Sequence, residues 1–320
     1  MTHVLVVGSI HPDAVAMLEA ADGVTYELTD GATEDCYAHR IADADVLLIR
    51  TQPMTEATIS NAKRLRLVSR HGVGYDAVDT NALTKRGIPL CIVGDVNSGG
   101  VAEHAIMMIL ASVKLAVRSD AAVRNGDWSW RNTLEAGEIG GKNLLILGYG
   151  RIGGKLARLA KGFDMTVKAF DPFLAANGWP EGDVQPVDTL EEALAWADVI
   201  SIHAPKPDKP LIGERELAAM KATAVIVNTS RGGIIDEKAL ADALRSRKIR
   251  AAGIDVFDIE PPLPDNPLFG LDNVLLSPHI AGLTQEGSER LGVHSVRNIL
   301  DFLSGRLDPS LVVNGVSLDG

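Results

Sequence analysis

One segment, residues 143–161, constrains the fold more than any other part of the chain. Asn143–Leu147 is a mostly apolar run, glycines follow at positions 148, 150 and 153, and an amphipathic helical pattern continues to Lys161. A short apolar run that passes through a glycine turn directly into a helix is typical of a strand–turn–helix unit in a parallel sheet. We therefore expect an α/β fold around this segment.

The same alternation of short apolar runs and helical patterns covers most of the 320 residues. Further strands are expected at Val4–Val7, Val46–Ile49, Leu67–Ser69, Val199–Ile202, Val225–Val227, Ile254–Val256 and Val274–Leu276, with helices at Ile152–Lys161, Leu190–Ala195 and Glu237–Ser246. One long helix is expected from about residue 100 to 122, and the amphipathic stretch Gln285–Leu303 can return to the first part. The length exceeds a typical domain of about 100–200 residues, so two domains are expected.

The glycine turn has the spacing of a dinucleotide site. Gly148 permits a tight turn, Gly150 lets a pyrophosphate approach the backbone, and Gly153 allows the helix to pack closely on the strand. A second strand, Met165–Phe170, leads to Asp171, whose carboxylate can bind ribose hydroxyls and would repel a ribose phosphate. The sequence therefore predicts NAD rather than NADP, with basic Arg151 as a complication.

Charge and composition limit the other classes of function. The net charge of -11 argues against a general nucleic-acid or membrane-surface binder but allows a local basic pocket for an acidic substrate. No export leader is evident at the start, and no uninterrupted apolar stretch reaches the roughly 20 residues that cross a bilayer. Cys36 and Cys91 have neither metal-like nor disulfide-framework spacing, so we expect a cytoplasmic protein without a metal site.

Seven separated segments together resemble the D-isomer-specific 2-hydroxyacid dehydrogenases over nearly the whole length, especially the phosphoglycerate and hydroxypyruvate dehydrogenase branch. They are residues 70–76, 101–104, 148–153, 203–205, 228–233, 255–260 and 277–279. The resemblance implies a doubly wound parallel-sheet Rossmann NAD domain at residues 99–283. It also implies a smaller, discontinuous flavodoxin-like α/β substrate domain at residues 1–98 and 284–320, with the reaction in the cleft between the domains. A homodimer is implied as well, with Trp128 and Trp130 near the contact, although aromatic core positions explain these tryptophans equally well.

Reduction of a 2-keto acid needs a hydride donor, a proton donor for the ketone oxygen, and groups that hold the carboxylate. The resemblance assigns His279 as the general acid in reduction and the general base in oxidation, with Glu260 as its carboxylate partner. It assigns Arg231 to the substrate carboxylate, which a guanidinium binds bidentately. Without the resemblance, Arg231 can also be a surface residue that pairs with Asp236 or Glu237.

The resemblance extends to the residues that bind the two ligands. The expected cofactor contacts are Gly148, Gly150, Arg151, Ile152, Gly153, Asp171, His203, Pro205, Thr229, Ser230, Arg231, Asp255, His279 and Gly282. The expected substrate contacts are Arg50, His71, Gly72, Val73, Gly74, Arg231 and His279, with the glycine loop exposing successive backbone amides to a carboxylate. His71 replaces a residue that is often small in relatives, which alters the pocket size or adds a donor for a distal substrate group. His104 is expected to be a helix-packing histidine and not an acid.

These features predict an NAD-dependent oxidoreductase that transfers a hydride between nicotinamide and C2 of a small anionic D-2-hydroxy or 2-keto acid. Phosphoglycerate, hydroxypyruvate, glyoxylate and acidic analogues all stay open, because small pocket changes decide between them. Two alternatives also stay open: a noncatalytic, NAD-sensing protein like the corepressors of this fold, and a formate or phosphite dehydrogenase. In the formate branch an amide is expected in place of Glu260. At this length we expect no regulatory domain of the kind found in longer phosphoglycerate dehydrogenases.

Overall fold

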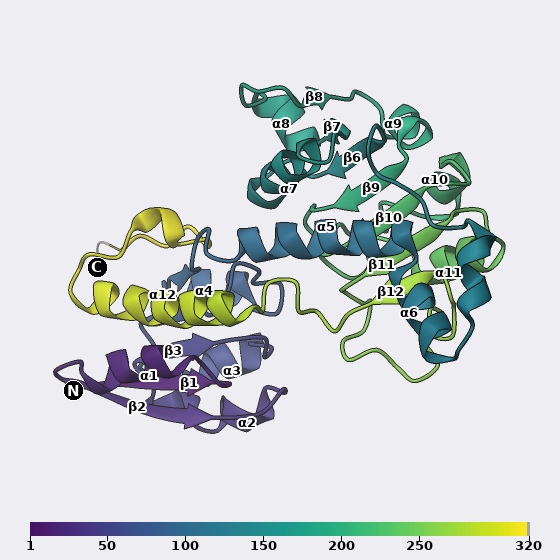
Figure 1. Ribbon diagram of the computed structural model, residues 1–320. Helices are drawn as coiled ribbons and strands as arrows, with labels where there is room; N and C mark the ends of the chain where they lie inside the picture. The colour runs from purple at the N-terminus through teal and green to yellow at the C-terminus, as the bar shows by residue number, and fades with distance from the viewer. Residues whose placement is uncertain (319–320) are drawn as a thin grey trace. The chain divides into compact units, whose positions relative to one another are not determined.

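A computed structural model describes residues 1–318, which form two compact units, each with its own sheet and core (Figure 1). Unit 1 contains residues 1–97 and 284–318, and unit 2 contains Ser98–Leu283. Both units are built from parallel strands covered by helices on both faces, which confirms the predicted α/β class.

Unit 1 contains a five-stranded parallel sheet in the order β2-β1-β3-β4-β5. The strands are β1 (Thr2–Val7), β2 (Val24–Thr29), β3 (Val46–Ile49), β4 (Leu67–Arg70) and β5 (Leu90–Cys91). The helices are α1 (Pro12–Glu19), α2 (Asp35–Ala38), α3 (Glu56–Asn61), α4 (Thr80–Lys85) and α12 (Gln285–Leu303), with 3-10 turns η1 (Ile41–Asp43) and η3 (Pro309–Leu311).

The central strands of unit 1 are buried on both faces. In β1, Val4 and Val6 belong to the core beneath α1 and α12, whereas Leu5 and Val7 belong to the core on the opposite face. This alternation explains why β1 is an unbroken apolar run instead of an alternating one. Helix α12, drawn in yellow in Figure 1, packs on α1 although the two are far apart in sequence.

Unit 2 contains a seven-stranded parallel sheet in the order β12-β11-β10-β9-β6-β7-β8. The strands are β6 (Asn143–Leu147), β7 (Thr166–Phe170), β8 (Gln185–Pro186), β9 (Val199–Ile202), β10 (Val225–Asn228), β11 (Ala251–Ile254) and β12 (Val274–Leu276). The helices are α5 (Ser98–Lys114), α6 (Ala116–Arg124), α7 (Arg151–Lys161), α8 (Pro172–Asn177), α9 (Leu190–Trp196), α10 (Glu214–Ala219) and α11 (Glu237–Arg245), with the 3-10 turn η2 (Trp128–Thr133).

The strand order of unit 2 reverses between β6 and β9. The chain runs outward from β6 through β7 to β8, then returns to β9 and runs the other way to β12. Helices α5 and α7 pack on one face, and α9, α10 and α11 pack on the other, which confirms the doubly wound arrangement. In such sheets ligands bind beyond the carboxyl ends of the strands at this reversal.

Two predicted elements are wrong in detail. The single helix expected from about residue 100 to 122 is two helices, because Leu115 adopts a left-handed conformation with φ 54° between α5 and α6. The strand expected at Ile254–Val256 is β11, which ends at Ile254, since an apolar run does not reveal where pairing stops.

No single helix within residues 1–318 is long and apolar enough to cross a membrane, and the bent pair α5–α6 meets the length and composition criteria only jointly.

Candidate active site

Five parallel strands of unit 2 bring predicted site residues to one edge of the sheet. Gly148 follows β6, His203 follows β9, Thr229–Arg231 follow β10, Asp255 follows β11, and His279 follows β12. Because the strands are parallel, their carboxyl ends share an edge. Residues that are up to 131 positions apart in the sequence are therefore neighbours around one part of the surface.

The His279 imidazole pairs with the Glu260 carboxylate, with 2.7 Å between Nδ1 and Oε2. The other carboxylate oxygen accepts a 3.0 Å hydrogen bond from the backbone N–H of Phe257. Burial alone would raise the pKa of the Glu260 carboxyl, but these two hydrogen bonds and the charges of His279 and Arg231 lower that pKa overall. Glu260 is therefore ionised at neutral pH and fixes the orientation of the imidazole.

The turn that carries His279 is anchored by Asp255. The backbone N–H of His279 donates to the Asp255 carbonyl at 2.8 Å, and His279 has a left-handed φ of 53°. The Asp255 carboxylate is fully buried and accepts from the backbone N–H groups of Ile280 and Ala281, each at 3.0 Å, and from the Ser277 hydroxyl. Asp255 therefore fixes the backbone on both sides of the imidazole.

His104 supports the same turn from α5. Its Nε2 lies 3.0 Å from the Ser277 hydroxyl oxygen and 3.6 Å from the Asp255 carboxylate. His104 is therefore a helix-packing histidine, as expected, and it packs α5 against the turn that carries His279. Periodicity placed it on a helix but carried no information on which strand end faced it.

Arg231 lies in a loop that is shaped by the buried Asn228 side chain. The amide of Asn228 donates to the Arg231 carbonyl at 2.8 Å and accepts from the Ser230 N–H and hydroxyl, each at 3.0 Å. Arg231 donates from Nη1 to the Ser230 carbonyl at 2.7 Å, and its charge reaches Glu260 closely enough to lower the pKa of that carboxyl. The guanidinium and the acid–base pair thus occupy one neighbourhood.

Glu237 is a supporting residue whose role the sequence did not indicate. Its carboxylate accepts from the backbone N–H of Asp258 at 2.7 Å and from the Asn266 amide at 2.8 Å. Burial, followed by the negative charges of Asp258 and Glu260, raises the pKa of Glu237 despite these hydrogen bonds. From the first turn of α11, Glu237 therefore holds the loop that ends at Glu260.

The glycine turn after β6 fits a dinucleotide. Gly148 has a φ of 92°, and a Cβ there would lie 2.6 Å from the His203 carbonyl oxygen. A Cβ at Gly153 would lie 2.4 Å from the Gly148 carbonyl oxygen, whereas a Cβ at Gly150 would meet nothing within 4 Å. Gly148 and Gly153 therefore pack closely against neighbouring backbone, whereas the space next to Gly150 is open. In such turns the backbone at the middle glycine binds a pyrophosphate.

Two buried polar atoms without partners in the described chain lie at the same edge of the sheet as this turn. The Thr229 hydroxyl oxygen and His203 Nδ1 are buried and have no hydrogen-bond partner within residues 1–318. Buried polar groups are ordinarily paired, so such atoms indicate a place for ligand atoms or ordered water. Together with the open middle glycine, they fit the binding of a polar cofactor.

Asp171 follows β7 and already accepts three backbone hydrogen bonds. Its carboxylate receives the N–H groups of Tyr149 at 2.9 Å, Phe173 at 3.0 Å and Leu174 at 3.1 Å. It therefore caps α8 and ties that helix to the glycine turn. The other predicted cofactor residues of unit 2 lie in the first turn of α7 (Arg151 and Ile152), in the loop after β9 (Pro205) and in the turn after Ala281 (Gly282).

The predicted substrate residues of unit 1 lie at the carboxyl ends of β3 and β4. Arg50 donates from Nη1 to the Ser9 carbonyl at 2.7 Å, and the buried His71 donates its backbone N–H to the Ile49 carbonyl at 2.8 Å. The Gly72 N–H donates to the Arg70 carbonyl at 2.8 Å. In the expected anion nest at Gly72, Val73 and Gly74, the amide of Gly72 is therefore engaged within the turn.

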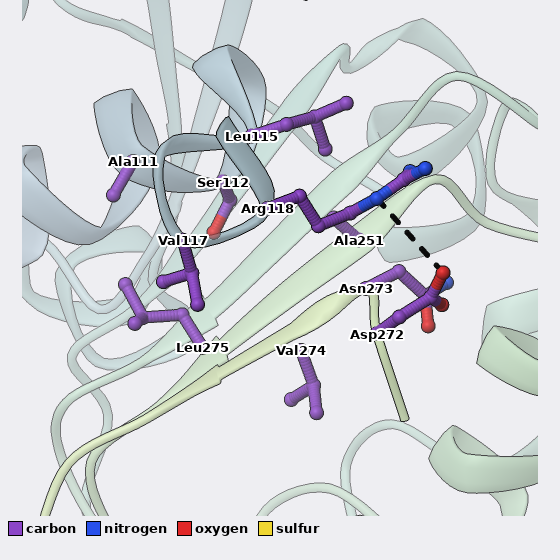
Figure 2. A pocket seen from close by; sticks show the side chains of 10 residues that line it. All are labelled: Ala111, Ser112, Leu115, Val117, Arg118, Ala251, Asp272, Asn273, Val274 and Leu275. Atoms are coloured by element: carbon purple, nitrogen blue, oxygen red, sulfur yellow. Dashed lines mark ion pairs between the residues drawn. The ribbon is translucent and has the colours of Figure 1, made fainter. Parts of the chain in front are cut away.

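Figure 2 shows a pocket of unit 2 that is separate from these residues. It is lined by residues of α5 and α6 and by the amino-terminal ends of β11 and β12, where Arg118 lies 3.9 Å from Asp272. The amino ends of parallel strands lie at the edge opposite their carboxyl ends. This pocket is therefore not the candidate active site.

A glycine-turn dinucleotide site and a paired imidazole and carboxylate, on one edge of a doubly wound sheet, define a nicotinamide-dependent type of oxidoreductase domain. A profile of the family "D-isomer specific 2-hydroxyacid dehydrogenase, NAD binding domain" matches residues 106–281. The chain belongs to the D-isomer-specific 2-hydroxyacid dehydrogenase family, and these residues form its NAD-binding domain.

Individual relatives agree with this assignment. The chain is 38% identical over 315 residues to D-3-phosphoglycerate dehydrogenase of Methanocaldococcus jannaschii, covering 98% of this chain but 59% of that protein. It is 38% identical over 279 residues to glyoxylate reductase of Korarchaeum cryptofilum, covering 85% and 84% of the two chains. The structure of D-lactate dehydrogenase from Aquifex aeolicus, complexed with NAD and lactic acid, superposes with a TM-score of 0.87 at 27% identity, covering 98% and 100%.

Proposed function

We propose that this chain is an NAD-dependent D-2-hydroxyacid dehydrogenase that interconverts a small anionic 2-hydroxy acid and its 2-keto acid. The observation that carries the proposal is the 2.7 Å pair of His279 and Glu260, with the charge of Arg231 reaching the same carboxylate. A proton donor that is oriented by an ionised partner, beside a fixed cation, meets the needs of keto-acid reduction.

We infer the roles of these residues from the geometry. Since Nδ1 of His279 faces Glu260, Nε2 is the ring nitrogen that donates a proton to the ketone oxygen in reduction and removes it in oxidation. The Glu260 carboxylate stabilises the imidazolium form, and the Arg231 guanidinium binds the substrate carboxylate. Asp255 and Glu237 hold the backbone segments that carry His279 and Glu260.

Cofactor binding is assigned to the carboxyl edge of unit 2. NAD supplies the hydride acceptor for oxidation, and NADH supplies the hydride for C2 in reduction. We assign the pyrophosphate to the glycine turn at Gly150, and the ribose hydroxyls to Asp171, whose negative charge disfavours NADP. In unit 1 we assign substrate contacts to Arg50, His71 and the 72–74 loop.

A substrate panel tests the proposal. NADH oxidation is followed with glyoxylate, hydroxypyruvate, phosphohydroxypyruvate and oxaloacetate, using the unaltered chain and His279→Ala. We expect His279→Ala to lower kcat by about 100-fold or more, because positioned acid–base groups contribute roughly that much, with NADH affinity retained. His39→Ala, at an exposed histidine of unit 1, is the matched control and should leave kcat unchanged.

The two alternatives give different results in this assay. A noncatalytic NAD-sensing protein would bind NADH but would not oxidise it with any keto acid of the panel. A formate or phosphite dehydrogenase would reduce NAD with one of those anions and leave the keto acids untouched. Full turnover by His279→Ala would remove the proposed acid–base role.

We also propose a homodimer in the cytoplasm. Helix α6 and the 3-10 turn η2 have no buried residue, and Val117, Val123, Trp128 and Leu134 are 60%, 60%, 69% and 87% exposed. Trp128 is therefore not a core residue, and an apolar surface of this kind favours a protein contact. The free thiols of Cys36 and Cys91 suit a reducing compartment. Sedimentation of the unaltered chain and of Trp128→Glu tests the dimer.

A further inference from the structure

The carboxyl edge of the sheet in unit 1 contains a buried histidine that the acid–base chemistry does not use. His71 follows β4, and the register pairs Ile49 with Arg70, so Arg50 and His71 are the next residues on adjacent strands. The His71 N–H donates to the Ile49 carbonyl at 2.8 Å, which fixes its backbone on that edge. His71 as a whole is only 6% exposed.

The imidazole of His71 lacks a polar partner at its far nitrogen. Within residues 1–318, Nε2 is buried and has no hydrogen-bond partner. Burial, then the charges of Arg50 and Arg70, lower the pKa of His71 to about 3, so the ring is neutral at physiological pH. A neutral imidazole can donate or accept one hydrogen bond at this nitrogen, and leaving it unpaired is unfavourable.

A second buried polar atom without a partner within residues 1–318 belongs to Gln52, two positions after Arg50. The Gln52 amide donates to the Gly31 carbonyl at 2.6 Å, whereas its Oε1 is buried and has no partner in the described chain. A Cβ built at Gly8 would lie 3.0 Å from Arg50 Cδ and 3.1 Å from Gln52 Nε2, so Arg50 and Gln52 meet at the end of β1. The loops after β3 and β4 thus contain two neutral side chains, Gln52 and His71, each with a buried polar atom that has no partner within residues 1–318.

We propose that His71 is a specificity-determining residue that binds, through Nε2, an oxygen-bearing substituent on C3 of the 2-keto acid. This inference rests on the proposed function, and it specifies that the preferred 2-keto acids have an oxygen-bearing substituent on C3. A site with a buried polar atom rejects an analogue that lacks the matching group more strongly than an apolar pocket rejects an extra methylene. Hydroxypyruvate is therefore a better substrate than pyruvate or 2-oxobutyrate, whose apolar ends leave Nε2 unpaired.

The test compares kcat/KM for hydroxypyruvate, pyruvate and glyoxylate in the unaltered chain, His71→Leu and His71→Gln. Leucine has a similar volume but no hydrogen bond, and glutamine offers a polar group at a similar reach. We expect His71→Leu to lower the hydroxypyruvate-to-pyruvate ratio about tenfold or more, and His71→Gln to retain most of it. Glyoxylate, which has no C3, should change by less than about threefold in either variant.

A measurement on the unaltered full chain keeps the proposal testable if His71→Leu does not fold. In protein with ¹⁵N-labelled histidine, saturating D-glycerate should shift the Nε2 resonance of His71, and D-lactate should not. An unchanged substrate ratio in a folded His71→Leu protein, or equal shifts with both acids, overturns the proposal while leaving the dehydrogenase assignment intact. Absence of turnover with every keto acid overturns both.

Discussion

The backbone of Gly232 lies against the carbonyl oxygen of Phe257, so closely that a Cβ on residue 232 would lie 1.8 Å from that oxygen. This approach joins the loop that carries Arg231 to the loop that ends at Glu260. The contact is between backbones, so no side-chain rotation can relieve an added methyl group. The proximity of the Arg231 guanidinium and the Glu260 carboxylate therefore depends on residue 232 being a glycine.

Gly232→Ala should separate the two loops. We expect kcat/KM for the preferred keto acid to fall by about 100-fold or more, because a misplacement of about 1 Å is enough for such a loss. Gly99→Ala is the control, since its Cβ would meet nothing within 4 Å and alanine favours the helix in which it lies. Steady-state kinetics and thermal unfolding check both variants; wild-type kinetics in Gly232→Ala would refute the role given to this contact.

Asp171→Ser should change the choice of cofactor with little effect on folding. Serine also caps helices well, so it can retain part of the capping that Asp171 provides to α8. Removal of the negative charge relieves repulsion of a ribose phosphate, so the ratio of kcat/KM for NADH over NADPH should fall about tenfold or more. The ratio is measured with one keto acid at saturation, and an unaltered ratio would show that Asp171 does not select the cofactor.

Asp255→Asn should loosen the turn that carries His279. An amide has one acceptor oxygen, so at least one of the N–H groups of Ile280 and Ala281 would face an NH₂ group inside a fully buried site. We expect a loss of about 1–3 kcal/mol in unfolding free energy and faster amide exchange at residues 279–282. Asp272→Asn, at an exposed carboxylate of unit 2, is the control. Unchanged exchange in Asp255→Asn would contradict the anchoring role.

Mild acid should destabilise the protein through its buried neutral histidines. Burial lowers the pKa of both His71 and His203 to about 3, so between pH 6.5 and pH 3 only the unfolded chain binds a proton at these side chains. Stability therefore falls as the pH falls through this window. Relative to its value at pH 8, each histidine should cost about 2 kcal/mol of unfolding free energy at pH 5.

Denaturant unfolding of the unaltered chain and His71→Gln at pH 8 and pH 5 measures this effect. The difference in stability between the two pH values should be smaller in the variant by about 2 kcal/mol. His39→Gln removes an exposed histidine and should leave the difference unaltered. Identical pH dependence in all three proteins would show that His71 takes up a proton in the folded state.

The sequence by itself determined the features that depend on neighbours along the chain. Apolar runs predicted the bounds of strands such as β3 and β9, because a strand buried on both faces contains few polar residues. The spacing of Gly148, Gly150 and Gly153 predicted the turn and its ligand, since backbone conformation at a glycine turn is a local property.

Only the tertiary structure decided which distant residues meet. The contacts of His104 with Ser277 and of Glu237 with Asp258 depend on strand order and packing across many intervening residues. The same holds for Nε2 of His71, which has no hydrogen-bond partner among the residues that the structure describes. The break at Leu115 was equally hidden, because periodicity continues through a single left-handed residue. Local sequence patterns indicate secondary-structure propensity and burial. Hydrogen-bond partners depend on the three-dimensional arrangement of the whole unit.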